Sequence, residues 1–235
     1  ASTKDEYTEK NVENRPYIYD AQYFAEDINT NSYSSSDGNQ YSISDICVPY
    51  INMKSDDADK MNSEIENYYK NFVQEFKVCS QNLNSYIKVN YETHITSNIY
   101  SILLTITRGQ ENNKTEEYVA YNFDIMSGTK LDYNQVCYVA GVQNSNESVH
   151  SLIYDLKDYN SYVLTASKNV SKQKVEERNA QIEACKAQTF TNYQEDLLNN
   201  VLVYFLDDNL KLNISVRLVF PDISKSGNKL MIVES

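Results

Sequence analysis

The chain has 235 residues, of which 41% are hydrophobic, so it belongs with folded proteins and is long enough for one large domain or two small ones. Its 33 acidic and 21 basic residues give a net charge of -12, which argues against nucleic-acid binding because phosphate neutralisation needs a basic face. The same charge suits a soluble protein, or one that attracts a basic partner.

The N-terminal part is polar. We expect residues 1–15 to form a flexible N-terminal arm, and we interpret it as the start of a fragment cut just after a membrane anchor or signal sequence. A trimmed cytosolic domain would look similar. No stretch approaches the roughly 18 apolar residues that cross a bilayer, so we expect no membrane span within this chain. The chain also does not open with the charged and apolar regions of a signal peptide.

Two short extended runs are expected next, at 17–28 and 41–50, with a turn-rich loop between them. Pro49 marks the second run as an edge strand, since proline cannot donate to a central ladder. A helix follows from about Asp57 to Phe76, with N-cap candidates at 55–57. Its apolar residues recur at spacings of three and four: Met61, Ile65, Tyr68, Tyr69, Phe72 and Phe76.

Three strands then alternate apolar and polar residues, at 87–95, 100–106 and 118–125, with a polar hairpin loop at 108–114. Their short connections predict an antiparallel meander. In the third strand, Val119, Tyr121, Phe123 and Ile125 share the buried face, and Ser127-Gly128 makes a turn. We expect the rest of the chain to pack around this strand.

The C-terminal part is also expected to contain both helices and strands. We expect a short helical turn or an irregular crossing at 131–141, helices at 147–159 and 167–188, and a strand or helix end at 201–206. A long strand at 210–220 and a closing strand at 230–233 follow. The second helix is polar and is expected to lie on the surface. The predicted fold class is α+β: an antiparallel sheet with helices packed on it.

The reactive residue types form no recognised motif. Cys47, Cys79, Cys137 and Cys185 contain no CxxC pair, so they could form two disulfides or remain buried thiols. His94 and His150 stand in no metal-binding spacing, and no phosphate-binding glycine motif occurs. We therefore expect no catalytic residues, no cofactor-binding residues, no metal ligands and no cofactor.

Tyrosine is the one over-used residue type, with 21 copies and no tryptophan. Exposed tyrosines can stack on sugars or anchor a protein interface, and the candidates are Tyr68, Tyr69, Tyr133, Tyr138, Tyr154, Tyr159 and Tyr162. The simpler interpretation is that tyrosine replaces phenylalanine and tryptophan throughout the core.

Three passages resemble one bacterial family. They are ICVPYINMKSDDADKMNSEIENYYKNF at 46–72, YVAYNFDIMSGTKLDYNQV at 118–136, and FLDDNLKLNISVRLVFP with SGNKLMIVES at 205–235. Together they resemble the extracytoplasmic region of RsiV-like anti-sigma factors, a region also found beside secreted polysaccharide deacetylase domains. The residues at 220–227 depart from the tyrosine, proline and alanine-glycine usual around the family's closing turn.

The resemblance implies a non-catalytic, extracytoplasmic binding or sensor domain, secreted or anchored at the cell surface, rather than an enzyme. It implies an N-terminal α+β subdomain at 16–105 and a C-terminal RsiV-like subdomain at 106–235, packed as one unit. The partner it implies is a basic protein such as lysozyme, and the alternative is cell-wall glycan.

Overall fold

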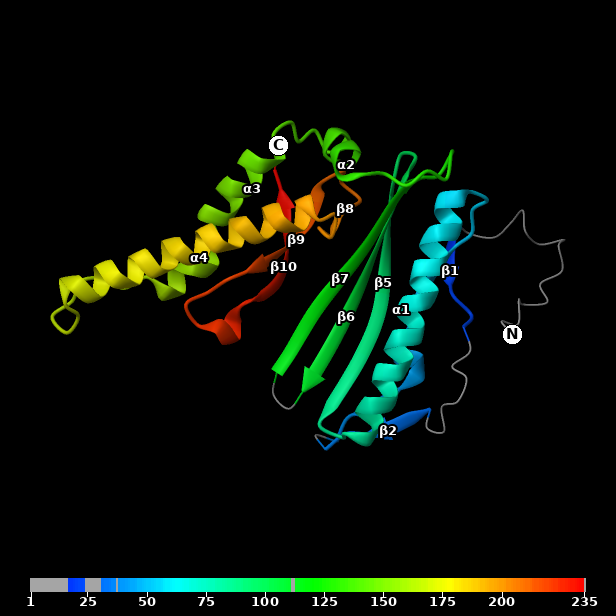
Figure 1. Ribbon diagram of the computed structural model, residues 1–235, viewed down its shortest axis with the longest axis horizontal. Coiled ribbons are helices and arrows are strands. Elements are labelled where there is room, and N and C mark those ends of the chain that lie inside the picture. Colours follow the sequence, from blue (N-terminus) through cyan, green and yellow to red (C-terminus); the bar gives the residue numbers. More distant parts are fainter. Residues whose placement is uncertain (1–16, 24–30, 37, 111–112, 235) are drawn as a thin grey trace. The chain divides into compact units, whose positions relative to one another are not determined.

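The computed structural model describes residues 17–23, 31–36, 38–110 and 113–234 (Figure 1). The chain divides into two compact units, Ala1–Leu131 (unit 1) and Asp132–Ser235 (unit 2). The expected arm at 1–15 lies outside the described residues. The division expected between residues 105 and 106 differs from the one found, because it would cut through a strand that is paired along both edges.

Unit 1 contains two small strand pairs, one long helix and a three-stranded sheet. Its elements are β1 (Ile18–Asp20), β2 (Ser32–Ser34), β3 (Gln40–Ser42), β4 (Pro49–Ile51), α1 (Asp56–Gln81), β5 (Ser85–Thr96), β6 (Ile99–Gln110) and β7 (Asn113–Asp124). β1 pairs with β4 and β2 with β3, while β5, β6 and β7 form an antiparallel meander with β6 in the centre. The helix α1 lies along this sheet (Figure 1).

The core of unit 1 lies between α1 and the sheet. The apolar stripe of α1 is buried against alternate residues of all three strands, including Ile87, Ile102 and Phe123. Ser55 caps the helix by accepting a hydrogen bond from the backbone of Ala58, as its position before two aspartates predicts. Periodicity therefore identified both layers of this core.

Several expectations for unit 1 need correction. The strand at 118–125 is the C-terminal part of β7, an edge strand, so the core is organised around β6 instead. The polar residues expected to form a loop at 108–114 largely continue the β6–β7 ladder, because their backbones still pair across the strands up to Gln110 and Asn113. The run at 41–50 is split into β3 and β4 by a 3-10 turn at Ile43–Asp45. Residues 24–28 of the first run lie outside the described part.

Unit 2 contains three α-helices and a second three-stranded sheet. Its elements are α2 (Tyr133–Val139), α3 (Ser145–Tyr154), α4 (Lys172–Leu198), β8 (Tyr204–Leu206), β9 (Leu212–Leu218) and β10 (Gly227–Val233). The antiparallel strand order is β10-β9-β8, so the long strand expected at 210–220 is central. α4 packs on β9 and α3 packs on α4.

Two helices of unit 2 differ from their predicted bounds. The first ends at Tyr154 and is followed by a 3-10 helix at Lys157–Tyr162, because the buried Tyr159 bonds to Thr189 and to the backbone of Val219 instead of continuing the helix. The second begins later and extends ten residues further, to Leu198, since its final turns are buried at Thr189, Asn192 and Tyr193. The predicted α+β class, with antiparallel sheets and packed helices, is confirmed.

Candidate functional site

Tyrosines gather on one side of α1, where β1 and β4 approach it. The rings of Tyr19 and Tyr50 lie 5.2 Å apart, and so do those of Tyr23 and Tyr69. We call these four residues the Tyr23 surface. Three of them are half-buried, and the buried Tyr69 donates a hydrogen bond to the backbone of Tyr23. Of these four residues only Tyr69 was among the candidates predicted from the sequence, because the other three come from separate short strands and loops.

Carboxylates border the Tyr23 surface. Burial, reinforced by the nearby Glu66 carboxylate, raises the pKa of Tyr23 to about 12. Burial also raises the pKa of Tyr50, with contributions from Tyr19 and Asp59. The Tyr23 surface therefore combines neutral aromatic rings with fixed negative charge, a pairing that suits lysine or arginine side chains.

A second aromatic and acidic set lies on the other side of α1, along β7. Tyr68 follows Glu64 by one helical turn, and its exposed ring stacks on Phe72 with centroids 5.9 Å apart. Tyr121 of β7 points toward these residues, because Glu64 and Tyr68 are the charged and polar neighbours that act on its hydroxyl. Adjacent residues of a helix are rotated about 100° from one another around its axis, so Tyr68 and Tyr69 lie on different sides of α1.

An ion-pair network also connects α1 to the sheet, closer to the C-terminal end of α1. Arg108 of β6 donates to both carboxylate oxygens of Glu75 at 2.6 and 3.1 Å and to Glu117 of β7 at 2.7 Å. Burial alone would lower the pKa of Arg108, but the hydrogen bonds to the two carboxylates outweigh it and raise that pKa. We call the line from Glu64, Tyr68 and Tyr121 to Arg108, Glu75 and Glu117 the α1–β7 seam.

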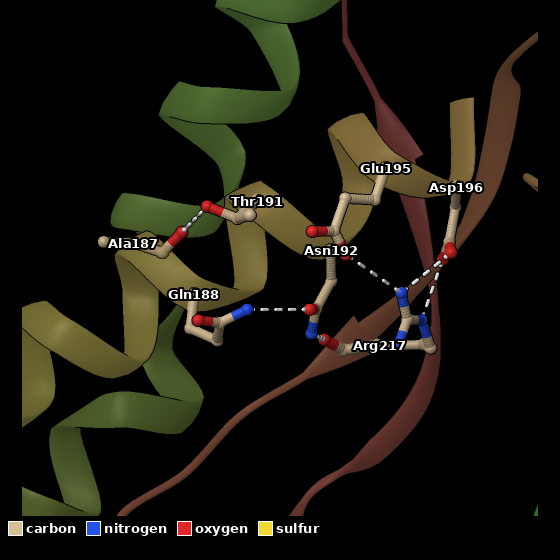
Figure 2. A network of polar contacts seen from close by, with 7 residues as sticks. All are labelled: Ala187, Gln188, Thr191, Asn192, Glu195, Asp196 and Arg217. Atoms are coloured by element: carbon tan, nitrogen blue, oxygen red, sulfur yellow. Dashed lines mark hydrogen bonds and ion pairs between the residues drawn. The ribbon is translucent and has the colours of Figure 1, made fainter. Parts of the chain in front are cut away.

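A polar network in unit 2 attaches α4 to β9 (Figure 2). Arg217 of β9 makes a bidentate pair with Asp196 at 2.8 and 2.9 Å, and it approaches Glu195 at 4.0 Å. Asn192 donates to the Arg217 carbonyl at 2.9 Å and accepts from Gln188 at 3.1 Å. Because these groups satisfy one another, the network is a structural connection between helix and strand.

The turn in the passage at 118–136 also serves the fold. Asp124 accepts hydrogen bonds from the backbones of Met126 and Ser127, and Gly128 takes a φ of +70° that favours glycine. The Gly128 carbonyl accepts from Ser55, the N-cap of α1, at 2.8 Å. A side chain at Gly128 would stand 2.6 Å from that same Ser55 hydroxyl. The turn thus locks the start of α1 to the end of β7.

The four cysteines carry free thiols, and all except the half-buried Cys47 are buried, so the two-disulfide alternative is excluded in this structure. Asp20 accepts hydrogen bonds from both Cys47 and Tyr91, connecting β1 to β5. Burial, then the Asp20 charge, raises the pKa of Cys47 to about 11, which keeps this thiol protonated and unreactive.

The two histidines lie in different units. His94 is on β5, 3.4 Å from Glu92, and His150 is on α3, stacked on Tyr154 and edge-on to Phe190. Within the described residues, no three histidine, cysteine or acidic side chains lie together as a metal site. No described helix combines the length and apolar character that a bilayer-crossing segment needs.

The other tyrosine candidates have different environments. Tyr133 and Tyr159 are buried in unit 2, where they bond to Tyr193 and Thr189, and Tyr154 and Tyr162 are half-buried. Tyr138 on α2 is 86% exposed. Core tyrosine therefore explains part of this set, and Tyr68 and Tyr138 are the members open to a partner.

No protein-family model matches the chain, and no curated protein matches it. The features that bear on function are therefore the surfaces of unit 1 and unit 2 and the resemblance of the three sequence passages.

Proposed function

We propose that this chain is a non-catalytic, extracytoplasmic binding module that recognises a basic partner protein through unit 1. The resemblance to RsiV-like anti-sigma factors suggests lysozyme as that partner and sensing as the role. The observation that carries the proposal is the Tyr23 surface, where half-buried tyrosines lie beside Asp59 and Glu66.

The distribution of charge supports this choice of surface. Unit 1 contains 20 acidic and 11 basic residues, a net charge of -9, whereas unit 2 contains 13 and 10, a net charge of -3. Most of the negative charge therefore belongs to the unit that carries the Tyr23 surface. Such a charge accelerates encounter with a basic protein, while tyrosines at the contact supply most of the binding energy.

The test is isothermal calorimetry of the full chain against hen and human lysozyme, at low and at physiological salt. We expect saturable one-to-one binding that weakens as salt rises. A double variant at the Tyr23 surface, Asp59→Asn with Glu66→Gln, should bind more weakly. The matched control is Glu176→Gln with Glu177→Gln on the exposed start of α4, which removes the same charge from unit 2 and should bind as the wild type does. Absence of heat at both salts overturns the lysozyme version.

Cell-wall glycan is the second candidate, and the exposed Tyr138 ring of unit 2 favours it because sugars stack on aromatic faces. Sedimentation with purified peptidoglycan tests it. Retention of the wild type and loss of retention in Tyr138→Ala would support glycan binding, and a chain that stays in the supernatant rejects it.

A further inference from the structure

The two ends of the α1–β7 seam are built alike, but only one contains a cation. At one end the guanidinium of Arg108 is held between Glu75 of α1 and Glu117 of β7. At the other end Glu64 of α1 faces Tyr121 of β7. Among the described residues Glu64 makes no ion pair, whereas Glu66, two positions along the helix, pairs with Lys70 at 2.9 Å.

A buried hydroxyl marks this second end. Tyr121 is 2% exposed, and no hydrogen bond of normal geometry reaches its buried hydroxyl oxygen among the residues that the structure describes, while the Glu64 carboxylate lies near enough to act on it. Burial, followed by the Glu64 carboxylate, raises the pKa of Tyr121, so the hydroxyl is neutral at physiological pH. A buried polar atom left unpaired costs about 1–3 kcal/mol, so an arrangement that pairs it is favoured.

We propose that Glu64, Tyr68 and Tyr121 form an anchor site for an arginine side chain of the partner protein. The site rests on the proposed function and adds a second contact with the same partner, on the other side of α1 from the Tyr23 surface. A guanidinium there would donate to the Glu64 carboxylate and to the Tyr121 oxygen, while the Tyr121 hydroxyl proton is donated to Glu64. Its flat face would stack on the exposed ring of Tyr68.

The chemistry favours arginine over lysine. A guanidinium presents several donors in one plane, so it can bond two acceptors while stacking on a ring, whereas an ammonium is a compact and strongly hydrated charge. Glu64 and Tyr68 are exposed side chains, so each can turn about its own bonds to meet an arginine without moving the backbone. The Arg108 end shows that this seam accommodates a guanidinium between α1 and β7.

The first experiment needs no partner protein. Full-length chain with ¹³C-labelled tyrosine rings is titrated with acetyl-arginine amide, acetyl-lysine amide and the neutral isostere acetyl-citrulline amide. We expect saturable shifts of the Tyr68 and Tyr121 signals that are largest for arginine and absent for citrulline. Glu64→Gln should abolish them, while Glu92→Gln, an equal charge change on β5, should leave them intact. Equal shifts with citrulline, or unchanged shifts in Glu64→Gln, overturn the site.

The second experiment separates this site from the proposed function. If the wild type binds lysozyme, Glu64→Gln and Tyr121→Phe should each weaken binding about tenfold, because each removes a charged or polar contact to the arginine. Tyr121→Phe should weaken binding without lowering the stability of the fold, since it deletes a buried hydroxyl that has no hydrogen bond of normal geometry among the described residues. A tyrosine with only a structural role would instead lose stability and keep its affinity for lysozyme. Unchanged lysozyme affinity in both variants overturns the anchor and leaves the binding module standing. Absence of wild-type binding rejects lysozyme, and the amide titration then decides the anchor alone.

Discussion

The two units attach a long helix to a three-stranded sheet in different ways. Unit 1 relies on an apolar stripe, since most of the α1 positions facing the sheet are hydrophobic and buried. Unit 2 relies more on polar contacts, since two of the five buried residues of α4, Thr189 and Asn192, bond to the β9 strand and its continuation. The more acidic unit therefore has the more apolar helix face, which leaves its charges on the outer surface for a partner.

The largest expected effect removes the apolar contact of unit 1. Phe76 of α1 is fully buried and touches the ring of Tyr33 edge-on. Phe76→Ala should lower the free energy of unfolding by about 3–5 kcal/mol, because it leaves a cavity between helix and sheet. Denaturant titration measures this, with Val78→Ala on the exposed side of the same helix as the control. Equal effects of the two would contradict an apolar attachment.

The corresponding change in unit 2 is polar. Thr189 is fully buried, and its hydroxyl accepts from the Val219 backbone at 2.9 Å and contacts the Tyr159 hydroxyl at the same distance. Thr189→Val keeps the shape but leaves the Val219 amide unpaired, so we expect a loss of about 1–3 kcal/mol by denaturant titration. Thr191→Val, which removes only an exposed bond to the Ala187 carbonyl of the same helix, should cost under about 0.5 kcal/mol (Figure 2). A larger loss from Thr191→Val than from Thr189→Val would disprove the polar attachment.

A smaller effect comes from the arginine that each unit uses between helix and sheet. Arg108→Gln and Arg217→Gln should each cost about 1 kcal/mol or less, because both pairs are partly exposed. The loss at Arg108 should be the greater, since that side chain is 31% exposed and binds two carboxylates, whereas Arg217 is 48% exposed. Thermal unfolding at low and high salt measures both, and the reverse order would show that unit 2 depends more on its ion pair.

The smallest effect at neutral pH concerns one half-buried tyrosine in each unit. Burial raises the pKa of Tyr23 in unit 1 and of Tyr204 in unit 2 to about 12, from 10.0. Above pH 10 the unfolded chain loses these protons first, so stability should be complete below that pH and should fall as pH rises toward 12. Tyr23→Phe and Tyr204→Phe should each flatten this fall in denaturant titrations. An unchanged slope in both variants would show that neither phenol contributes.

Sequence periodicity predicted much of the fold because it reports which face of one element is buried. The stripe of α1 and the three alternating strands were identified in this way, and the Ser55 cap was identified from its residue type before two aspartates. The unit boundary and the central place of β6 were missed, because they depend on how strands pair. The α1–β7 seam was missed for the same reason: Glu64 and Tyr121 are neighbours only through the packing of α1 on the sheet. The Glu64–Tyr68 spacing was the one available signal.

The contact between Ser55 and Gly128 has a consequence for synthesis of the chain. The two residues are 73 positions apart, so the ribosome makes α1 long before the turn that closes over its first residues. Until β7 and that turn emerge, only part of the sheet is present to bury the apolar stripe of α1. During that time nascent α1 must remain exposed or be held by a chaperone. Unit 1 therefore reaches its final form late, when nearly all of its 131 residues have been made.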